Sequence, residues 1–434
     1  MSKYKSVFSL IVCLLLIGKL SAQAPDVPSP APAQTGKIYL TNATIHLGNG
    51  KVLQNATIGF ENGKIIFLEE NPSIKTDATM GTVVNCTGKH IYPGIIATNT
   101  IIGLTEIEAV RATNDMAEVG LFNPNVRAIV SYNTDSRVTP TLRSNGVLYA
   151  QVAPQGGYVS GTSAVVQLDA WNWEDAAVKN EDGVFINWPS MFKFKWAEPQ
   201  GYEMNKDYDK ELDGLKAYFK DAKSYTQTPT HEKTNLGFEA MKGLFDKSKN
   251  LYINVNYVKE MENVIAFAES MDVNVVLVGA KDSYMVADLL AQKKIPVILS
   301  KCHDLPTYDD EDIQQPYKTP GILQKAGVLY CISIGAFWQE RNLMFEAGTA
   351  SAYGLTKEEA LEAITLNPAK ILKVDNQIGT LEKGKEASLI VSTGDVLDMK
   401  TSTIEQAYIS GRKIDLSNKQ KALNEKFSKK YGVN

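Results

Sequence analysis

Residues 88–105 read GKHIYPGIIATNTIIGLT, and this stretch decides the fold. An apolar, β-branched run follows the Pro93-Gly94 pair and predicts a buried strand. Side chains on a strand repeat every two residues, so Ala97, Asn99 and Ile101 are expected to point the same way. One face of this strand therefore carries a methyl, an amide and an alkyl side chain.

Short alternating β patterns occupy both ends of the chain. They cover 37–43, 52–60, 64–68, 384–391 and 407–413. Glu61-Asn-Gly63 separates two of these runs, and Asn-Gly predicts a type I′ hairpin turn because both central residues need positive φ. We therefore predict one small β-sandwich domain of residues 37–92 plus 378–416.

The middle of the chain alternates buried strands with helices. The apolar strand-like runs are 251–256, 273–278, 295–299 and 328–334. Met261, Val264, Ile265 and Ala268 recur at helical spacing between them, and Thr356 with Glu359 forms a capping box. Such alternation is typical of βα units, and residues 93–377 suit the roughly 250 residues of a (β/α)8 TIM-type barrel. Segment 166–235 is less regular and is expected to be an elaborated loop.

The chain begins with an export signal. Lys3 and Lys5 precede an apolar run and Leu20-Ser-Ala22, so residues 1–22 are expected to be a signal peptide that is removed. The proline- and alanine-rich residues 23–36 predict a solvated linker, and residues 417–434 predict a helical tail. The mature protein is expected to be periplasmic or secreted.

Charge and cysteine content exclude several classes of function. Signal removal takes away three lysines and no acids, which leaves 42 basic against 49 acidic residues and a net charge of −7. This balance argues against nucleic acid as a partner, and no further segment predicts membrane insertion. Cys86, Cys302 and Cys331 are widely spaced and odd in number, so they predict neither a disulfide framework nor a zinc knuckle.

Several motifs along the middle of the chain are similar to those of one superfamily. They are NTDSR (133–137), RSNGV (143–147), PQGG (154–157), EAGTA (346–350) and LNPA (366–369). Together with Pro93-Gly94 and its strand, they resemble the imidazolonepropionase-like branch of the amidohydrolase superfamily, over residues 37–415. The resemblance implies a barrel, one or two divalent metals such as zinc, and hydrolysis of non-peptide C–N bonds in small amides or cyclic compounds.

The positions that hold metal ligands in that superfamily carry other side chains here. The resemblance puts Asn99 and Ile101 where the first strand has a His-x-His pair. It puts Asn254 and Asn256 at the histidines of strand five, and Gly279 at the ending of strand six. The strand-eight sequence 331–336 has no aspartate. We therefore predict no metal cofactor.

The remaining polar residues near the predicted barrel mouth form the candidate site. The ligand-binding candidates are Asn99, Glu106, Arg137, Arg143, Asn254, Asn256, His303 and Arg341. Cys302, His303 and Asp135 are the candidates for a metal-free catalytic route. The alternative for these charged residues is structural ion pairing at the rim, and for the cysteine it is packing as a small hydrophobe.

Two functions follow from these observations. In the first, the chain is an exported pseudoenzyme that binds a small molecule or supports a partner, either as a homo-oligomer or paired with an active relative. In the second, it is an active hydrolase of carbon–nitrogen bonds other than peptides, with a shifted metal site or a metal-free mechanism.

Overall fold

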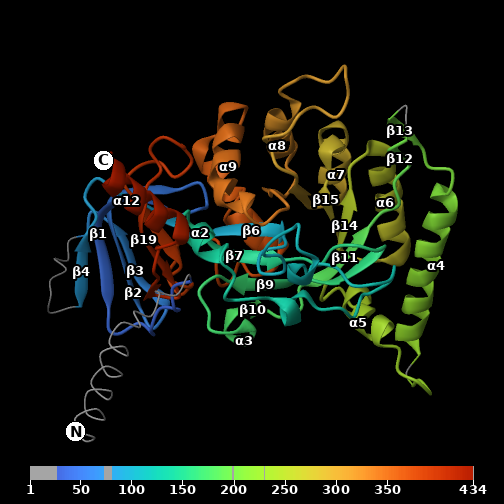
Figure 1. The fold of residues 1–434 in the computed structure, drawn as a ribbon, viewed down its shortest axis with the longest axis horizontal. Coiled ribbons are helices and arrows are strands. Elements are labelled where there is room, and N and C mark those ends of the chain that lie inside the picture. The colour runs from blue at the N-terminus through green and yellow to red at the C-terminus, as the bar shows by residue number, and fades with distance from the viewer. Residues whose placement is uncertain (1–26, 73–80, 198–199, 229, 434) are drawn as a thin grey trace, which may run out of the picture.

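The computed structural model describes residues 27–72, 81–197, 200–228 and 230–433. Strands from both ends of the chain form one sheet, and the middle of the chain forms a mixed α/β body beside it (Figure 1). The predicted signal peptide lies outside the described residues. Within the part of the chain that is described, no helix has the length and apolar character needed to cross a membrane.

The terminal sheet has eight strands. They are β1 (Ile38–His46), β2 (Val52–Glu61), β3 (Lys64–Glu70), β4 (Thr82–Asn85), β5 (His90–Pro93), β18 (Leu389–Ser392), β19 (Ile404–Ile409) and β20 (Arg412–Lys413). Their order is β20-β19-β18-β5-β1-β2-β3, with β4 beside β1. The two chain ends meet where β18 pairs antiparallel with β5, and a buried cluster including Leu40, Phe60 and Leu389 packs against the sheet. Asn62 and Gly63 have φ of 50° and 77°, which confirms the predicted hairpin turn.

The body contains two larger sheets and a hairpin. Its strands are β6 (Ile95–Thr100), β7 (Val147–Val152), β8 (Val159–Thr162), β9 (Ala164–Gln167), β10 (Ala177–Lys179), β11 (Gly183–Asn187), β12 (Phe192–Lys195), β13 (Gly201–Met204), β14 (Asn250–Val255), β15 (Val275–Gly279), β16 (Val297–Leu299) and β17 (Tyr330–Ile332). One sheet has the order β17-β16-β15-β14-β11-β8 and the other β10-β9-β7-β6. Strands β11, β14, β15, β16 and β17 are all parallel. The last four match the buried strands predicted from the sequence, whereas β11 was not predicted.

A continuous segment links the two sheets. This segment is residues 159–167. Its first half, β8, pairs antiparallel with β11 of one sheet, and its second half, β9, pairs antiparallel with β7 of the other, with Ser163 between them. The predicted alternation of parallel strands is therefore wrong at this point. Only residues 153–158 join β7 to β8, and a parallel return needs a crossover of a dozen or more residues.

Helices cover the outside of the body. They are α2 (Thr139–Arg143), α3 (Trp173–Ala176), α4 (Tyr208–Gln227), α5 (Leu236–Phe245), α6 (Val258–Met271), α7 (Ala287–Lys293), α8 (Gln315–Ala326), α9 (Leu343–Ala352), α10 (Lys357–Glu362), α11 (Leu366–Ile371) and α12 (Lys419–Tyr431), with 3-10 turns η1 (Arg111–Thr113), η2 (Ala128–Ser131), η3 (Lys281–Val286) and η4 (Gln339–Asn342). The predicted apolar face of α6 is buried, and Thr356 and Glu359 form the predicted capping box of α10.

Two segments differ from the sequence expectation. Segment 166–235 is not a loop, because it contributes β11 to the centre of a sheet and the 20-residue helix α4, which buries Leu215 and Phe219. The part of the proline-rich linker that the structure describes is docked rather than solvated. Ala31 donates its N–H to Asp169, and the Gln34 amide donates to the Phe60 carbonyl at 3.0 Å. A proline-rich chain is already extended, so docking costs it little conformational entropy.

Candidate functional site

The first barrel-type strand is kinked at its polar residue. Asn99 on β6 has φ of 51°, and the pairing of β6 with β7 shifts register between Ala97 and Thr100. Asparagine tolerates this left-handed conformation because its short side chain is polar and unbranched. The kink breaks the simple alternation expected from the sequence, and the Asn99 N–H donates to the buried Gln151 side chain at 3.0 Å.

Side-chain amides are hydrogen-bonded to one another at the ends of β11 and β14. The Asn254 amide donates to Asn187 Oδ1 at 2.9 Å, and the Asn187 amide donates to the Gly157 carbonyl at 2.8 Å. Asn256 follows β14 and faces Gly279, whose φ is 84°. A Cβ at position 279 would lie 2.7 Å from Asn256 Oδ1, so a larger side chain would not fit there without movement. The structure thus brings Asn254 together with Asn187, and Asn256 next to Gly279.

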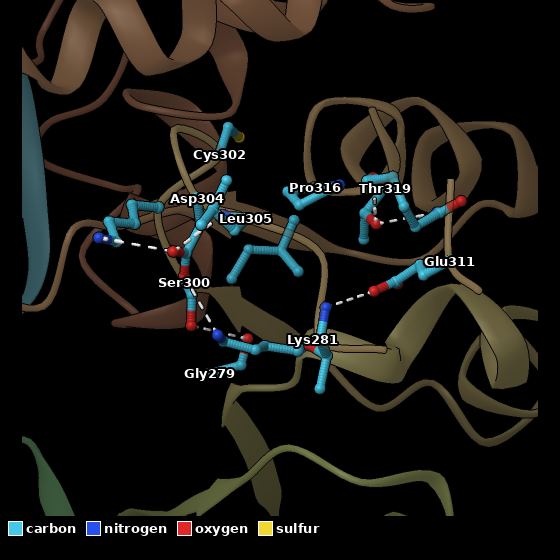
Figure 2. A pocket seen from close by; sticks show the side chains of 13 residues that line it. Gly279, Lys281, Ser300, Cys302, Asp304, Leu305, Glu311, Pro316 and Thr319 are labelled. Atoms are coloured by element: carbon cyan, nitrogen blue, oxygen red, sulfur yellow. Dashed lines mark hydrogen bonds and ion pairs between the residues drawn. The ribbon is translucent and has the colours of Figure 1, made fainter. Parts of the chain in front are cut away.

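A pocket lies beside these strand ends, under the segment that follows β16. It is lined by Gly279, Lys281, Ser300, Cys302, Asp304 and Leu305, among others (Figure 2). Lys281 Nζ lies 3.1 Å from Asp304 Oδ2, an ion pair that connects the two sides of the pocket. Tyr308 donates to Asp282 at 2.7 Å and Tyr284 donates to Glu311 at 3.0 Å, so η3 holds the same segment.

The adjacent Cys302 and His303 lie in different surroundings. The Cys302 side chain is buried, and burial raises the pKa of its thiol far above the ordinary value. A thiol that stays protonated is a poor nucleophile, so this residue does not fit the catalytic role considered for it. His303 is 39% exposed in its side chain and takes part in a different contact.

His303 lies between a buried carboxylate and a hydroxyl on α9. Its Nδ1 is 3.1 Å from Glu346 Oε1, its backbone N–H donates to Glu346 Oε2 at 2.7 Å, and its Nε2 is 2.6 Å from Thr349 Oγ1. The carboxylate favours a proton on Nδ1, which leaves Nε2 free to accept from the hydroxyl. Nothing in the sequence pointed to Thr349 or to this role of Glu346, because both lie more than 40 residues from His303.

A second cavity combines three of the predicted residues. Glu106, Asp135 and Arg137 line it together with Phe337, Trp338 and Leu423, and we call it the α12 groove because α12 forms one wall. Glu106 accepts from the Asn133 amide at 3.2 Å and from the Arg137 backbone at 3.3 Å. The volume of about 680 Å³ lies in the range of ligand sites.

The other predicted arginines are engaged elsewhere. Arg143 is buried and lies before the start of β7, whereas Asn99 and Asn254 lie near the ends of β6 and β14. Its guanidinium is paired with Asp169. Asp169 also pairs with Arg412 at 2.9 Å, so Arg143 belongs to a structural ion network and not to the strand ends that carry Asn99 and Asn254. Arg341 donates from its guanidinium to the Trp338 carbonyl within its own turn.

A buried carboxyl near the mouth was missed from the sequence. Glu340 is fully buried, and its Oε1 accepts from the Ala336 N–H at 3.1 Å, while Oε2 has no hydrogen-bond partner among the described residues. Burial, with a smaller contribution from nearby Glu346, raises the pKa of Glu340 to about 8. The raised pKa favours the protonated, neutral carboxyl, and this group accepts the hydrogen bond from the turn after β17.

Comparison with known proteins agrees with this architecture. The family model described as "Amidohydrolase family" matches residues 309–414. The crystal structure of an amidohydrolase from Thermotoga maritima MSB8 is similar with a TM-score of 0.75 and 25% identity, over 87% of this chain and 99% of that one. The chain belongs to the amidohydrolase superfamily. No curated protein matches.

Two more distant solved structures share the fold alone. A molinate hydrolase matches with a TM-score of 0.54 and 14% identity, over 89% of this chain and 95% of that one. A Xaa-Pro dipeptidase with bound methionine matches with a TM-score of 0.55 and 11% identity, over 88% of this chain and 100% of that one. Assignment to the imidazolonepropionase-like branch stays a prediction.

The donor set at the strand ends does not fit the divalent metals of the amidohydrolase superfamily. Those metals prefer imidazole nitrogen and carboxylate oxygen. Here the corresponding side chains are the amides of Asn99 and Asn254 and the alkyl chain of Ile101, and Gly279 offers no side chain. Across the described residues, no group of three or more His, Cys, Asp or Glu side chains is arranged to hold a metal ion.

Proposed function

We propose that this protein is an exported amidohydrolase-superfamily member that has lost metal-dependent hydrolysis and binds a small molecule or supports an active partner. The observation that carries the proposal is the chemistry of the strand ends. The Asn254 amide donates to Asn187, the Asn187 amide donates to the Gly157 carbonyl, and a side chain at Gly279 would require Asn256 to move and would sit at a positive φ. The scaffold is retained while the ligand positions are committed to other contacts.

We also infer that the two sheets of the body form one closed barrel, with the terminal sheet folded as a β-sandwich. At one junction residues 159–167 belong to both sheets. At the other junction the Ser333 hydroxyl donates to the Thr98 carbonyl at 2.6 Å, and the Ile101 N–H donates to the Ala336 carbonyl at 3.2 Å. Contacts at both edges support closure.

Metal content and chelator sensitivity test the loss of metal chemistry. The mature protein, purified without chelator, should contain metal well below one equivalent and should not hydrolyse amides, hydantoins or lactams in a chelator-sensitive way. The Asn99→His/Ile101→His variant should not gain activity, because the ligands from the other strands would still be missing. Stoichiometric zinc, manganese or iron, with activity lost on chelation, would contradict the proposal.

One contact favours a metal-free hydrolase as a second candidate function. In that mechanism, His303 Nε2 takes the proton of Thr349 while Oγ1 attacks a carbonyl carbon, and Glu346 stabilises the resulting imidazolium. The imidazolium then gives the proton to the leaving nitrogen as the C–N bond breaks, and water hydrolyses the ester left on Thr349. The distances of 2.6 Å and 3.1 Å suit these transfers. Chelator-resistant hydrolysis that Thr349→Ala and His303→Ala abolish would support this candidate. Ser351→Ala is the matched control, since its hydroxyl bonds only the α9 backbone among the described contacts.

A further inference from the structure

The C-terminal helix α12 carries an apolar stripe that its own chain leaves exposed. Leu423, Phe427 and Tyr431 recur every four residues and are 40%, 45% and 66% exposed. No residue of α12 is buried. Among the described residues, hydrogen bonds from the rest of the chain reach the helix near its start, where Asn418 donates to Ser144 at 2.8 Å and Thr141 donates to Gln420 at 3.0 Å. In Figure 1 it lies at the outside of the molecule, close to the C-terminus.

The charge on α12 is strongly positive. The helix has five lysines and one glutamate. Lys426 and Lys430 lie over the rings of Phe427 and Tyr431, at 5.8 Å and 5.1 Å from the ring centres, so positive charge surrounds the apolar stripe. A basic amphipathic helix of this kind fits a groove that is apolar inside and acidic at its edge.

The α12 groove has that character. Phe337 and Trp338 contribute its apolar wall, and Ile107, which is 55% exposed, extends the apolar surface beyond it. Three carboxylates, those of Glu106, Glu108 and Asp135, line the same groove together with the guanidinium of Arg137, so outside α12 the acidic groups outnumber the basic one. Since Leu423 at the start of the stripe forms part of the groove, the basic helix and the acidic groove are neighbours on one face.

We propose that this face is the interface of a homodimer, in which α12 of each copy docks in the α12 groove of the other. Two complementary surfaces that lie side by side can be satisfied reciprocally across a two-fold axis, which is the commonest symmetry of protein dimers. The apolar stripe of each copy supplies the buried anchors and the lysines meet the carboxylates of the partner. The protein therefore associates through an element outside the barrel.

Light scattering and sedimentation test the dimer with the full mature chain. Over about 1 to 100 µM, the molar mass should approach that of two chains, and high salt should weaken the association. Phe427→Glu/Tyr431→Glu should weaken it by about tenfold or more with an unchanged circular dichroism spectrum, because both side chains are exposed in the monomer. Tyr202→Glu, which changes an equally exposed aromatic on β13, is the matched control and should leave the dimer intact.

Charge reversal identifies the contact itself. Lys426→Glu/Lys430→Glu on α12 and Glu108→Lys/Asp135→Lys in the groove should each weaken the dimer. Mixing the two variants should restore a heterodimer. In one contact the acidic variant helix meets the basic variant groove, and in the other contact the helix and the groove are both unchanged. A chain that stays monomeric throughout this range, or a dimer that ignores both sets of changes, would overturn the proposal. Binding of monomers to phosphatidylglycerol vesicles that depends on Phe427 would also overturn it, by assigning α12 to a lipid surface.

Discussion

Glu340→Gln should remove a large pH dependence from the stability of the protein. The carboxyl is fully buried, and burial raises its pKa to about 8 in the folded chain against an ordinary value of 4.5. Because the folded pKa is raised, the unfolded chain releases this proton first. The stabilisation is complete below about pH 4.5 and is lost as the pH rises through the folded value.

The size of the effect follows from the shift. Between about pH 5 and pH 8 this one group should lower the free energy of unfolding by about 1.4 kcal/mol for each pH unit. Glutamine keeps an oxygen that accepts from the Ala336 N–H, and it cannot ionise. The variant should match the natural protein near pH 5 and exceed it by about 2 to 3 kcal/mol near pH 7.5.

Urea unfolding followed by tryptophan fluorescence, repeated at several pH values, measures the difference. Glu203→Gln, a change at an exposed carboxyl on β13, is the control and should leave the pH dependence unchanged. If Glu340→Gln and the natural protein lose stability in parallel from pH 5 to 8, the neutral buried carboxyl is refuted.

Three further predictions concern the buried ion network, the terminal sheet and export. Asp169→Asn should lower the free energy of unfolding by about 3 to 5 kcal/mol, because the guanidiniums of Arg143 and Arg412 lose their buried partner. Urea titration measures this change, and Glu174→Gln, at an exposed carboxyl, is the control that should alter the free energy little. Deletion of residues 378–434 removes β18 from β5 and should expose apolar surface, so the truncated chain should aggregate on size-exclusion chromatography; a monodisperse product with an unchanged melting profile would argue against it. Mass spectrometry of the exported protein should find Gln23 at the mature N-terminus, and an intact Met1 in the cytosolic fraction would contradict export.

Local patterns in the sequence were enough for much of the fold. Asn62-Gly63 specified its turn, the helical spacing from Met261 to Ala268 specified the buried face of α6, and the apolar runs specified the parallel strands β14 to β17. These features depend on φ preference and on side-chain period, which are properties of neighbouring residues. The unusual residues Asn99, Ile101 and Asn254 were also visible directly, because a side chain's ability to ligate a metal is intrinsic to its type.

Only the tertiary structure decided which polar groups meet. His303 contacts Glu346 and Thr349, which lie more than 40 residues away along the chain. Arg143 forms an ion pair with Asp169, which follows β9. Burial raises the pKa of Glu340, which favours its neutral form. The antiparallel course of 159–167 depends on the length of a connection between two strands that are not themselves unusual. Residue type sets what a side chain is able to do, but its protonation and its partners depend on burial and distance, which are created only when distant segments pack together.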